Sequence, residues 1–213
     1  MRIITISRQF GSGGRELGKR LADVLGWDYY DKEIIQRLAE ENNLDADYVS
    51  HMLNNHEWQN IPLTYQNSFS GPVVSLPVST SLLRGQRDII EGIAKTGNDC
   101  IIVGRDADII LSDYSPFKIF VCAEMEARVS RCMKHENKKP EDERLSEKQI
   151  EHNIKRIDKG RSQVREMLTG KSWGDSSAYN ITVNTAEWSI KDLVPAVADF
   201  AVKWFEHNEQ REK

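Results

Sequence analysis

The chain has 213 residues, of which 29% are charged and 39% hydrophobic, enough to bury the core of one compact domain. Its net charge of −4 and its pI near 5.8 give no general attraction to nucleic acid or to anionic membranes, so neither is an expected partner. The 3 cysteines have no paired spacing, and no apolar run is long enough to span a bilayer. These features favour a cytoplasmic protein without disulfides or a zinc site.

The N-terminal segment predicts a strand, a glycine-rich turn and a helix in direct succession. Arg2 to Ser7 is a short β-branched run typical of a buried strand, and the turn Gln9 to Gly14 (QFGSGG) follows it. A helix then begins at Arg15 and ends at Gly26. GSGG alone is more often an ordinary turn, but between a strand and a helix its backbone N–H groups and the helix dipole favour an anion. We therefore expect the phosphates of a nucleoside triphosphate to bind Gly11, Ser12, Gly13 and Gly14.

This loop differs from the pattern GxxxxGK[ST] at two places. No lysine follows the last glycine, and no serine or threonine stands where a magnesium ligand is expected. Arg15 and Glu16 occupy those places. An arginine can carry the positive charge that the lysine supplies, so Arg15 or Arg8 is the predicted substitute. The sequence assigns no metal ligand.

The rest of the chain alternates between predicted strands and helices. In order, we expect a strand over Trp27 to Tyr30, a helix from Lys32 capped by Asp31, an irregular insert from His51 to Pro77, a helix over Ser79 to Lys95, a strand over Cys100 to Val103, a strand over Phe117 to Cys122, a helix around Glu126 to His135, a solvated hinge from Glu136 to Glu147, a helix over Ile150 to Leu168, a strand over Tyr179 to Val183 and a helix over Leu193 to Trp204. This alternation predicts a parallel sheet covered on both faces, with ligands outside the carboxyl ends of its strands.

Six segments stand in a fixed order along nearly the whole chain: SRQFGSGGREL, YYDKEIIQR, LLRGQR, VGRDAD, KIFVCAEMEAR and TGKSWGD. Together they resemble the cytidylate kinase-like family. The resemblance implies a P-loop NTPase fold of three layers, α/β/α, around a central parallel sheet. It also implies a single domain over residues 1–213, with a nucleoside monophosphate-side insert at about 45–85 and a helical lid at about 136–175.

The same resemblance implies a nucleoside monophosphate kinase that transfers the γ-phosphate of ATP to CMP or dCMP with Mg²⁺. The residues implied on the ATP side are Arg8, Gly11, Ser12, Gly13, Gly14, Arg15 and Glu16. The residues implied around the acceptor are Asp31, Arg37, Arg84, Arg87, Arg105 and Asp106. The residues implied in catalysis are Arg15, Arg156, Asp158 and Arg161. The sequence predicts no oligomeric state.

Several of these residues have an ordinary structural alternative. Arginines on helices, here Arg37, Arg84 and Arg87, most often lie on a solvated face. Asp158 and Arg161 are three residues apart and could form a simple surface pair. Arg105 and Asp106 follow a buried strand, where they either pair with each other or contact a ligand.

Phosphoryl transfer to a monophosphate requires charge neutralisation and alignment more than a strong base, because the attacking oxygen is already anionic. We expect the glycine loop and Arg15 to bind the β- and γ-phosphates, and Arg156 and Arg161 to close over the transferring group. Two alternatives stay open: a P-loop kinase of another small acceptor, and an ATP-binding regulatory module without turnover, suggested by the missing GK[ST].

Overall fold

The computed structural model describes residues 1–42, 45–46 and 78–211, so the predicted irregular insert lies outside the described residues. The strands are β1 (Ile3–Arg8), β2 (Asp28–Tyr30), β3 (Cys100–Val103), β4 (Phe117–Cys122) and β5 (Ile181–Asn184). The helices are α1 (Gly14–Leu25), α2 (Lys32–Asn42), α4 (Val78–Lys95), α5 (Ala107–Ile110), α6 (Met125–Glu136), α7 (Glu147–Thr169) and α8 (Ile190–Arg211), with short 3-10 turns at η2 (Ser112–Tyr114), η3 (Glu141–Glu143) and η4 (Ser176–Ala178).

The described strands form one five-stranded sheet in the order β2-β3-β1-β4-β5, and every neighbouring pair is parallel. β1 is therefore the central strand, with Ile3 opposite Cys100 on one side and Ile4 opposite Phe117 on the other. The continuous apolar character of Cys100–Val103 reflects burial on both faces of the sheet, since all four residues are buried. The predicted α/β fold with a parallel sheet is confirmed.

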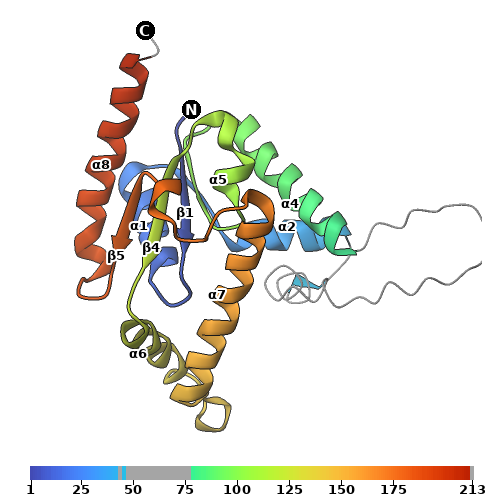
Figure 1. Cartoon of the computed structure of the whole chain (residues 1–213), viewed down its shortest axis with the longest axis vertical. Helices are drawn as coiled ribbons and strands as arrows, with labels where there is room; N and C mark the ends of the chain where they lie inside the picture. Colours follow the sequence, from blue (N-terminus) through green and yellow to red (C-terminus); the bar gives the residue numbers. More distant parts are fainter. Residues whose placement is uncertain (43–44, 47–77, 212–213) are drawn as a thin grey trace, which may run out of the picture.

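Helices cover both faces of the sheet (Figure 1). α1 and α8 pack on one face, where Leu17 and Val194 meet Ile4 and Ile101. α2, α4 and α5 pack on the other face, where Ile90 belongs to the same cluster as Ile3 and Ile102. The alternation of strand side chains between the two clusters follows from the two-residue period of a strand. No helix of the described part of the chain is long and apolar enough to cross a membrane.

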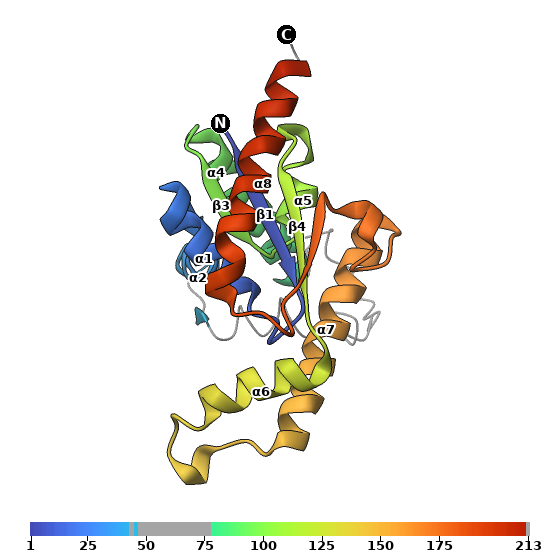
Figure 2. The ribbon, with the colours of Figure 1, turned by 90° about the vertical axis from the view of Figure 1, so that its left-hand side faces the viewer.

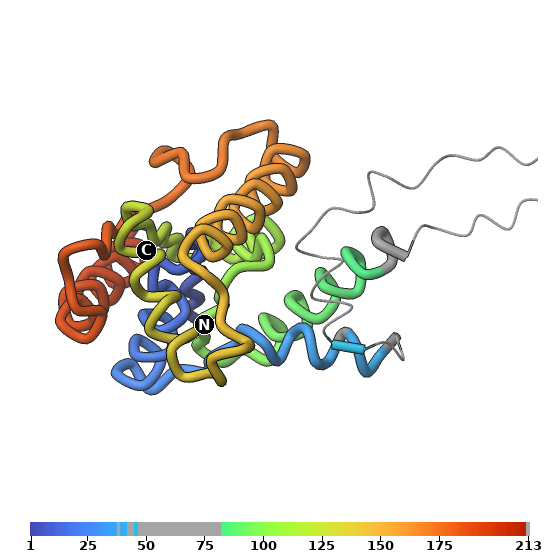
Figure 3. Tube along the Cα trace, turned by 90° about the horizontal axis from the view of Figure 1, so that it is seen from below, coloured from blue at the N-terminus to red at the C-terminus, as the bar shows by residue number. Residues whose placement is uncertain are grey.

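α6 and α7 form a helical pair at the carboxyl ends of the strands. Figure 2 shows α6 and the first half of α7 extending beyond the sheet, and Figure 3 shows the pair between α8 on one side and α2 and α4 on the other. A small separate core of Val129, Ile150 and Ile154 joins the two helices. The predicted lid region, about 136–175, covers α7 and the segment before it, whereas α6 precedes this region in the chain. Its function as a lid stays a prediction.

Some element boundaries differ from the prediction. α7 begins at Glu147, before the predicted Ile150, because Ser146 and Gln149 form a reciprocal capping box that starts the helix on polar residues. α8 extends past the predicted Trp204 to Arg211, first with the buried Phe205 and then with polar residues that carry no apolar pattern. β5 begins at Ile181, two residues after the predicted Tyr179.

Candidate functional site

The glycine loop joins β1 to α1 and has the backbone shape of an anion site. Gly11 and Gly13 have φ values of 77° and 83°, in the left-handed region that favours glycine. A Cβ on Gly14 would lie 2.6 Å from the Cβ of Arg8, so the loop passes too close to β1 for a side chain there. The backbone N–H groups of Gly14, Arg15 and Glu16 donate to no carbonyl of the described residues, which leaves the start of α1 available to an anion.

Contacts from β4 and from the β5–α8 connection fix the far side of the loop. The side chain of Thr185, fully buried, donates to the carbonyl oxygen of Ser12 at 2.6 Å. Arg131 of α6 donates to both the hydroxyl and the carbonyl oxygen of Thr185. The side-chain oxygen of Gln9 accepts from the N–H of Ala123 at 3.0 Å. The conformation of the loop is therefore fixed by hydrogen bonds to residues that lie far from it in the sequence.

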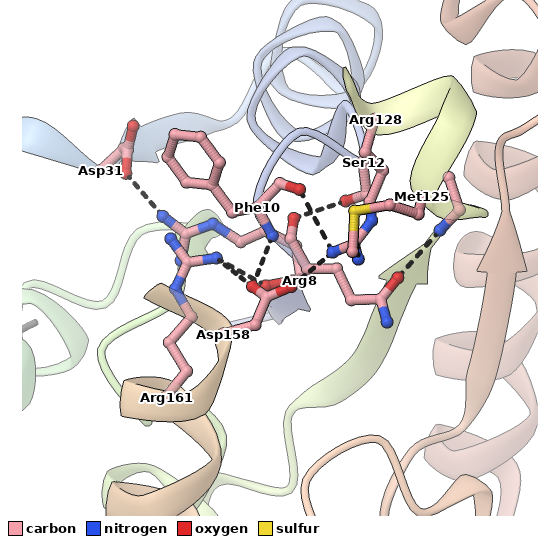
Figure 4. Close-up of polar contacts among 10 residues, drawn as sticks. Arg8, Phe10, Ser12, Asp31, Met125, Arg128, Asp158 and Arg161 are labelled. Atoms are coloured by element: carbon pink, nitrogen blue, oxygen red, sulfur yellow. Dashed lines mark hydrogen bonds and ion pairs between the residues drawn. The ribbon is translucent and has the colours of Figure 1, made fainter. Parts of the chain in front are cut away.

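Asp31, at the end of β2, is the buried anion of the site. Its side chain is 4% exposed and pairs with the guanidinium groups of Arg8 and Arg15. The Nη2 atom of Arg8 lies 3.4 Å from one carboxylate oxygen, and the Nη2 atom of Arg15 lies 3.5 Å from the same oxygen. Asp31 thus pairs with one arginine before the glycine loop and one after it, at the β2 side of the sheet. Figure 4 shows the contact with Arg8.

The turn after β3 is strained in a way that is uncommon outside functional sites. Gly104, Arg105 and Asp106 have successive positive φ values of 77°, 61° and 50°. The N–H of Gly104 donates to Ile6 at 2.8 Å, and the buried Gln86 donates from Nε2 to the carbonyl oxygen of Arg105 at 3.2 Å. These bonds hold the turn against the end of β1, where a Cβ on Gly104 would lie 1.7 Å from Nη1 of Arg8.

The electrostatics of this turn favour a bound anion. Burial, and then the nearby charge of Arg8, lower the pKa of Arg105 to about 10. Burial, and then Asp108, raise the pKa of Asp106 to about 6. Burial and Arg8 likewise lower the pKa of Arg161 to about 9. Since these arginines disfavour one another's charge, a phosphate among them would relieve the repulsion.

Arg161 of α7 completes the cluster. Its Nη1 atom donates to the carbonyl oxygen of Arg8 at 2.9 Å, and it pairs with Asp158 at 3.6 Å (Figure 4). Arg8, Arg105, Asp106 and Arg161 line a pocket of about 60 Å³ at the carboxyl edge of the sheet. The other lining residues are Ser7, Leu83, Gln86, Gly104, Val164 and Trp173.

A buried ion pair anchors α7 beneath this pocket. Arg165 and Asp108 pair at 2.6 Å, and their side chains are 5% and 2% exposed. The Arg165 guanidinium also lies over the ring of Tyr179, 5.4 Å from its centroid. Sequence reasoning missed this pair, as it missed Arg131 and Thr185, because nothing in the sequence signals partners more than fifty residues apart.

Five other residues implied by the sequence are not among the residues that line the pocket. Arg37 pairs with Glu41 and Arg87 with Glu91 along their own helices, and both arginine side chains are more than 60% exposed. Arg84 and Arg156 are also exposed. Glu16 pairs with Arg20 at 2.8 Å on the surface of α1.

The described residues offer few ligands for Mg²⁺. They contain no group of three or more His, Cys, Asp or Glu side chains that could hold a metal ion. The only hydroxyl in the glycine loop, that of Ser12, is buried and donates to Gln9. Mg²⁺ commonly binds through one or two carboxylates, substrate phosphates and water. The site fits such an ion with Asp106 as its protein ligand, since this carboxylate makes no ion pair with another described residue.

Comparisons with known proteins agree with this geometry. The model of the cytidylate kinase-like family matches residues 3–187. A cytidylate kinase from Haloarcula marismortui is 25% identical over 189 residues, which cover 87% of this chain and 82% of that protein.

Solved structures share the fold. An uncharacterised protein from Eubacterium ventriosum has a TM-score of 0.66 at 22% identity, covering 97% of this chain and 99% of that chain. A gluconokinase from Sinorhizobium meliloti has a TM-score of 0.53 at 12% identity, covering 100% of this chain and 98% of that chain. The three-layer P-loop kinase fold expected from the sequence is confirmed.

Proposed function

Because this chain belongs to the cytidylate kinase-like family, we propose that it transfers the γ-phosphate of ATP to a nucleoside monophosphate, with CMP or dCMP as the acceptor. The coarser assignment, a kinase of a nucleotide or another small molecule, follows from the family and the fold. The arginine cluster beside the glycine loop supports the finer one. A pocket of about 60 Å³ lined by three arginines suits a phosphate group, so the acceptor itself carries a phosphate.

In the proposed function, different groups of residues bind the ATP phosphates and the acceptor phosphate. The glycine loop and the open N–H groups of α1 bind the ATP phosphates, with Arg15 beside them. Arg105 and Arg161 bind the acceptor phosphate, and Arg8 lies between the two sites. The acceptor oxygen needs no general base because it is already anionic, so the arginines act by alignment and charge neutralisation. Mg²⁺, when bound, would neutralise charge on the transferred phosphates, and Asp106 is its candidate protein ligand.

A coupled ADP-release assay with ATP and Mg²⁺ tests the proposal, with CMP, dCMP, UMP, AMP and GMP as acceptors. We expect turnover with CMP and dCMP. Arg105→Ala should lower kcat/KM on the order of 100-fold, since it removes a charged contact to the phosphate. Arg37→Ala is the matched control and should stay within about 2-fold, because Arg37 is exposed and, among the described residues, pairs only along its own helix.

The other outcomes separate the alternatives. If no monophosphate stimulates turnover while a fluorescent ATP analogue still binds, the cytidylate acceptor is rejected. In that case a screen of phosphorylated and unphosphorylated small acceptors distinguishes another kinase activity from a regulatory module. If Arg37→Ala lowers turnover as strongly as Arg105→Ala, the assignment of the acceptor phosphate to the pocket is wrong.

A further inference from the structure

Asp158 occupies an unusual position for an acidic residue on a polar helix. Its side chain is only 14% exposed, and its oxygens contact the glycine loop instead of solvent. Oδ1 accepts from the backbone N–H of Phe10 at 2.8 Å, and Oδ2 pairs with Nη1 of Arg128 on α6 (Figure 4). Asp158 therefore joins the start of the loop to both helices of the α6–α7 pair.

The same contacts bind both polar groups of the Phe10 backbone. Nη1 of Arg128 lies 3.4 Å from the Phe10 carbonyl oxygen, so the Arg128–Asp158 pair contacts the N–H and the C=O of one residue. The Phe10 N–H has no backbone acceptor among the described residues, whereas Gln9 just before it still bonds to β4. The chain thus leaves the sheet at Phe10, where a hydrogen bond to Asp158 replaces the hydrogen bonds to neighbouring strands.

Arg161 links this anchor to the pocket. It lies one turn after Asp158 on α7, pairs with the same carboxylate and donates to the carbonyl oxygen of Arg8. Its guanidinium also lies 5.8 Å from the centroid of the Phe10 ring. Without the Asp158 carboxylate, Arg161 would keep its bond to Arg8 but lose the charge that directs it. Arg128, which is 6% exposed, would be left as a buried cation without a counter-charge.

We propose that Asp158 is a positioning residue whose carboxylate fixes the start of the glycine loop through Phe10 and orients Arg161 toward the pocket. This inference deepens the proposed function, because the loop it positions is the one assigned to ATP. The carboxylate oxygens are used by the Phe10 N–H and two arginines, so Asp158 acts through these groups and not by contact with the transferring phosphoryl group. The position of the α6–α7 pair and the shape of the loop are then coupled.

The first test uses the free protein and needs no substrate. Hydrogen–deuterium exchange of the peptide covering the glycine loop is compared for wild type, Asp158→Ala and Asp158→Asn. We expect exchange of the loop at least 10-fold faster in Asp158→Ala and intermediate in Asp158→Asn, which keeps an acceptor for the Phe10 N–H but loses the charge. Asp199→Asn is the matched control, because Asp199 is exposed on α8 and its ion pair among the described residues is with Lys203. Unchanged loop exchange in both Asp158 variants would overturn the inference, whatever the protein's activity.

The second test separates positioning from general stability. The melting temperature of Asp158→Asn should fall, because Arg128 loses its counter-charge. At a temperature where the variant is still folded, binding of a fluorescent ATP analogue and the KM for ATP should weaken about 10-fold. Adding Arg128→Met to Asp158→Asn should cost less than it costs in wild type, because the two residues act as one unit. A loss confined to kcat, with ATP affinity and loop exchange unchanged, would mean direct contact with the reacting group. If wild type itself binds no ATP, the proposed function fails while the exchange test still decides the role of Asp158.

Discussion

Gly104 illustrates how tightly single residues define the pocket. It has a positive φ, and its Cα faces the Arg8 guanidinium so closely that a methyl group would overlap Nη1. We expect Gly104→Ala to destabilise the fold by about 2 kcal/mol, from backbone strain and the displaced arginine. It should also lower kcat/KM at least 10-fold, because Arg8 lines the pocket.

The matched control for this change is Gly97→Ala. Gly97 has a φ of 81° but nothing within 4 Å of an added Cβ, so only the backbone strain applies. Urea denaturation and the ADP-release assay should show a loss of about 1 kcal/mol for Gly97→Ala with unchanged kinetics. Equal kinetic effects in the two variants would contradict the role given to the close approach of Arg8.

Asp106 should make stability depend on pH around the site. Its pKa in the folded protein is raised to about 6, above the ordinary value of 3.8, so the folded state binds the proton more tightly than the unfolded state. The cost to folding therefore grows as pH rises from about 4 to about 6, is complete above 6, and is absent below 4. We expect Asp106→Asn to melt at a higher temperature than wild type at pH 8.

This difference should shrink as pH falls through 6 and vanish near pH 4. Thermal melts at several pH values check it, with Asp113→Asn as the control on an exposed carboxylate. A difference that stays constant over this pH range would exclude titration of Asp106 as its cause.

Among the residues implied by the sequence, the structure gathers Arg8, Arg15, Asp31, Arg105 and Asp106 next to the glycine loop. Most of them follow the carboxyl ends of strands, where the sheet dictates the neighbourhood. Four implied arginines lie on exposed helix surfaces: Arg37, Arg84, Arg87 and Arg156. The direction of a helical side chain is set by its position in the 3.6-residue period of the helix, which a sequence motif does not reveal. Arg128, Arg131 and Thr185 could not be found from the sequence, since their partners are distant in the chain.

At the scale of elements, the start of α7 rests on a local signal. Ser146 accepts from the N–H of Gln149, and the Gln149 side chain accepts from the N–H of Ser146 at 2.8 Å. We expect Ser146→Ala to cost about 1 kcal/mol and to increase fraying of the first turn of α7. Ser112→Ala, at an exposed serine with no side-chain hydrogen bond to the described residues, is the control.

Urea denaturation gives the global effect, and hydrogen exchange of the peptide covering residues 146–150 gives the local one. Kinetics should change little, because Asp158 and Arg165 anchor α7 closer to the sheet. Loss of activity without fraying would contradict this view of the helix start.

Element types were predictable where apolar residues were concentrated, as in Cys100–Val103 and Phe117–Cys122, whose bounds agree with the structure. Boundaries moved where polar residues set them. α7 starts at a capping box and α8 ends in a charged tail, and neither carries an apolar period.

At the scale of the whole molecule, α8 closes the larger core. Phe205 is 7% exposed. The centroid of its ring lies 5.8 Å from that of Trp27, 5.0 Å from that of Trp204 and 6.2 Å from that of Phe117. We expect Phe205→Ala to lower the free energy of unfolding by about 3–5 kcal/mol, because it leaves a cavity between α8 and the sheet.

Phe200→Ala on the same helix is the control. This ring is 49% exposed, so its removal should cost only about 1 kcal/mol. Chemical denaturation followed by tryptophan fluorescence measures both values. Similar losses in the two variants would mean that α8 does not carry the core in this way.

The central position of β1 separates the molecule into two functional halves. The β2–β3 side of the glycine loop carries Asp31 and the strained turn, and the β4–β5 side carries Ala123 and Thr185. Each half meets the loop through its own contacts. Under the proposed function, substitutions in the strained turn on the β2–β3 side would change the acceptor, whereas Ala123 and Thr185 on the β4–β5 side would keep the shape of the loop. A laboratory exchange of that turn is then the natural route to a kinase of different specificity.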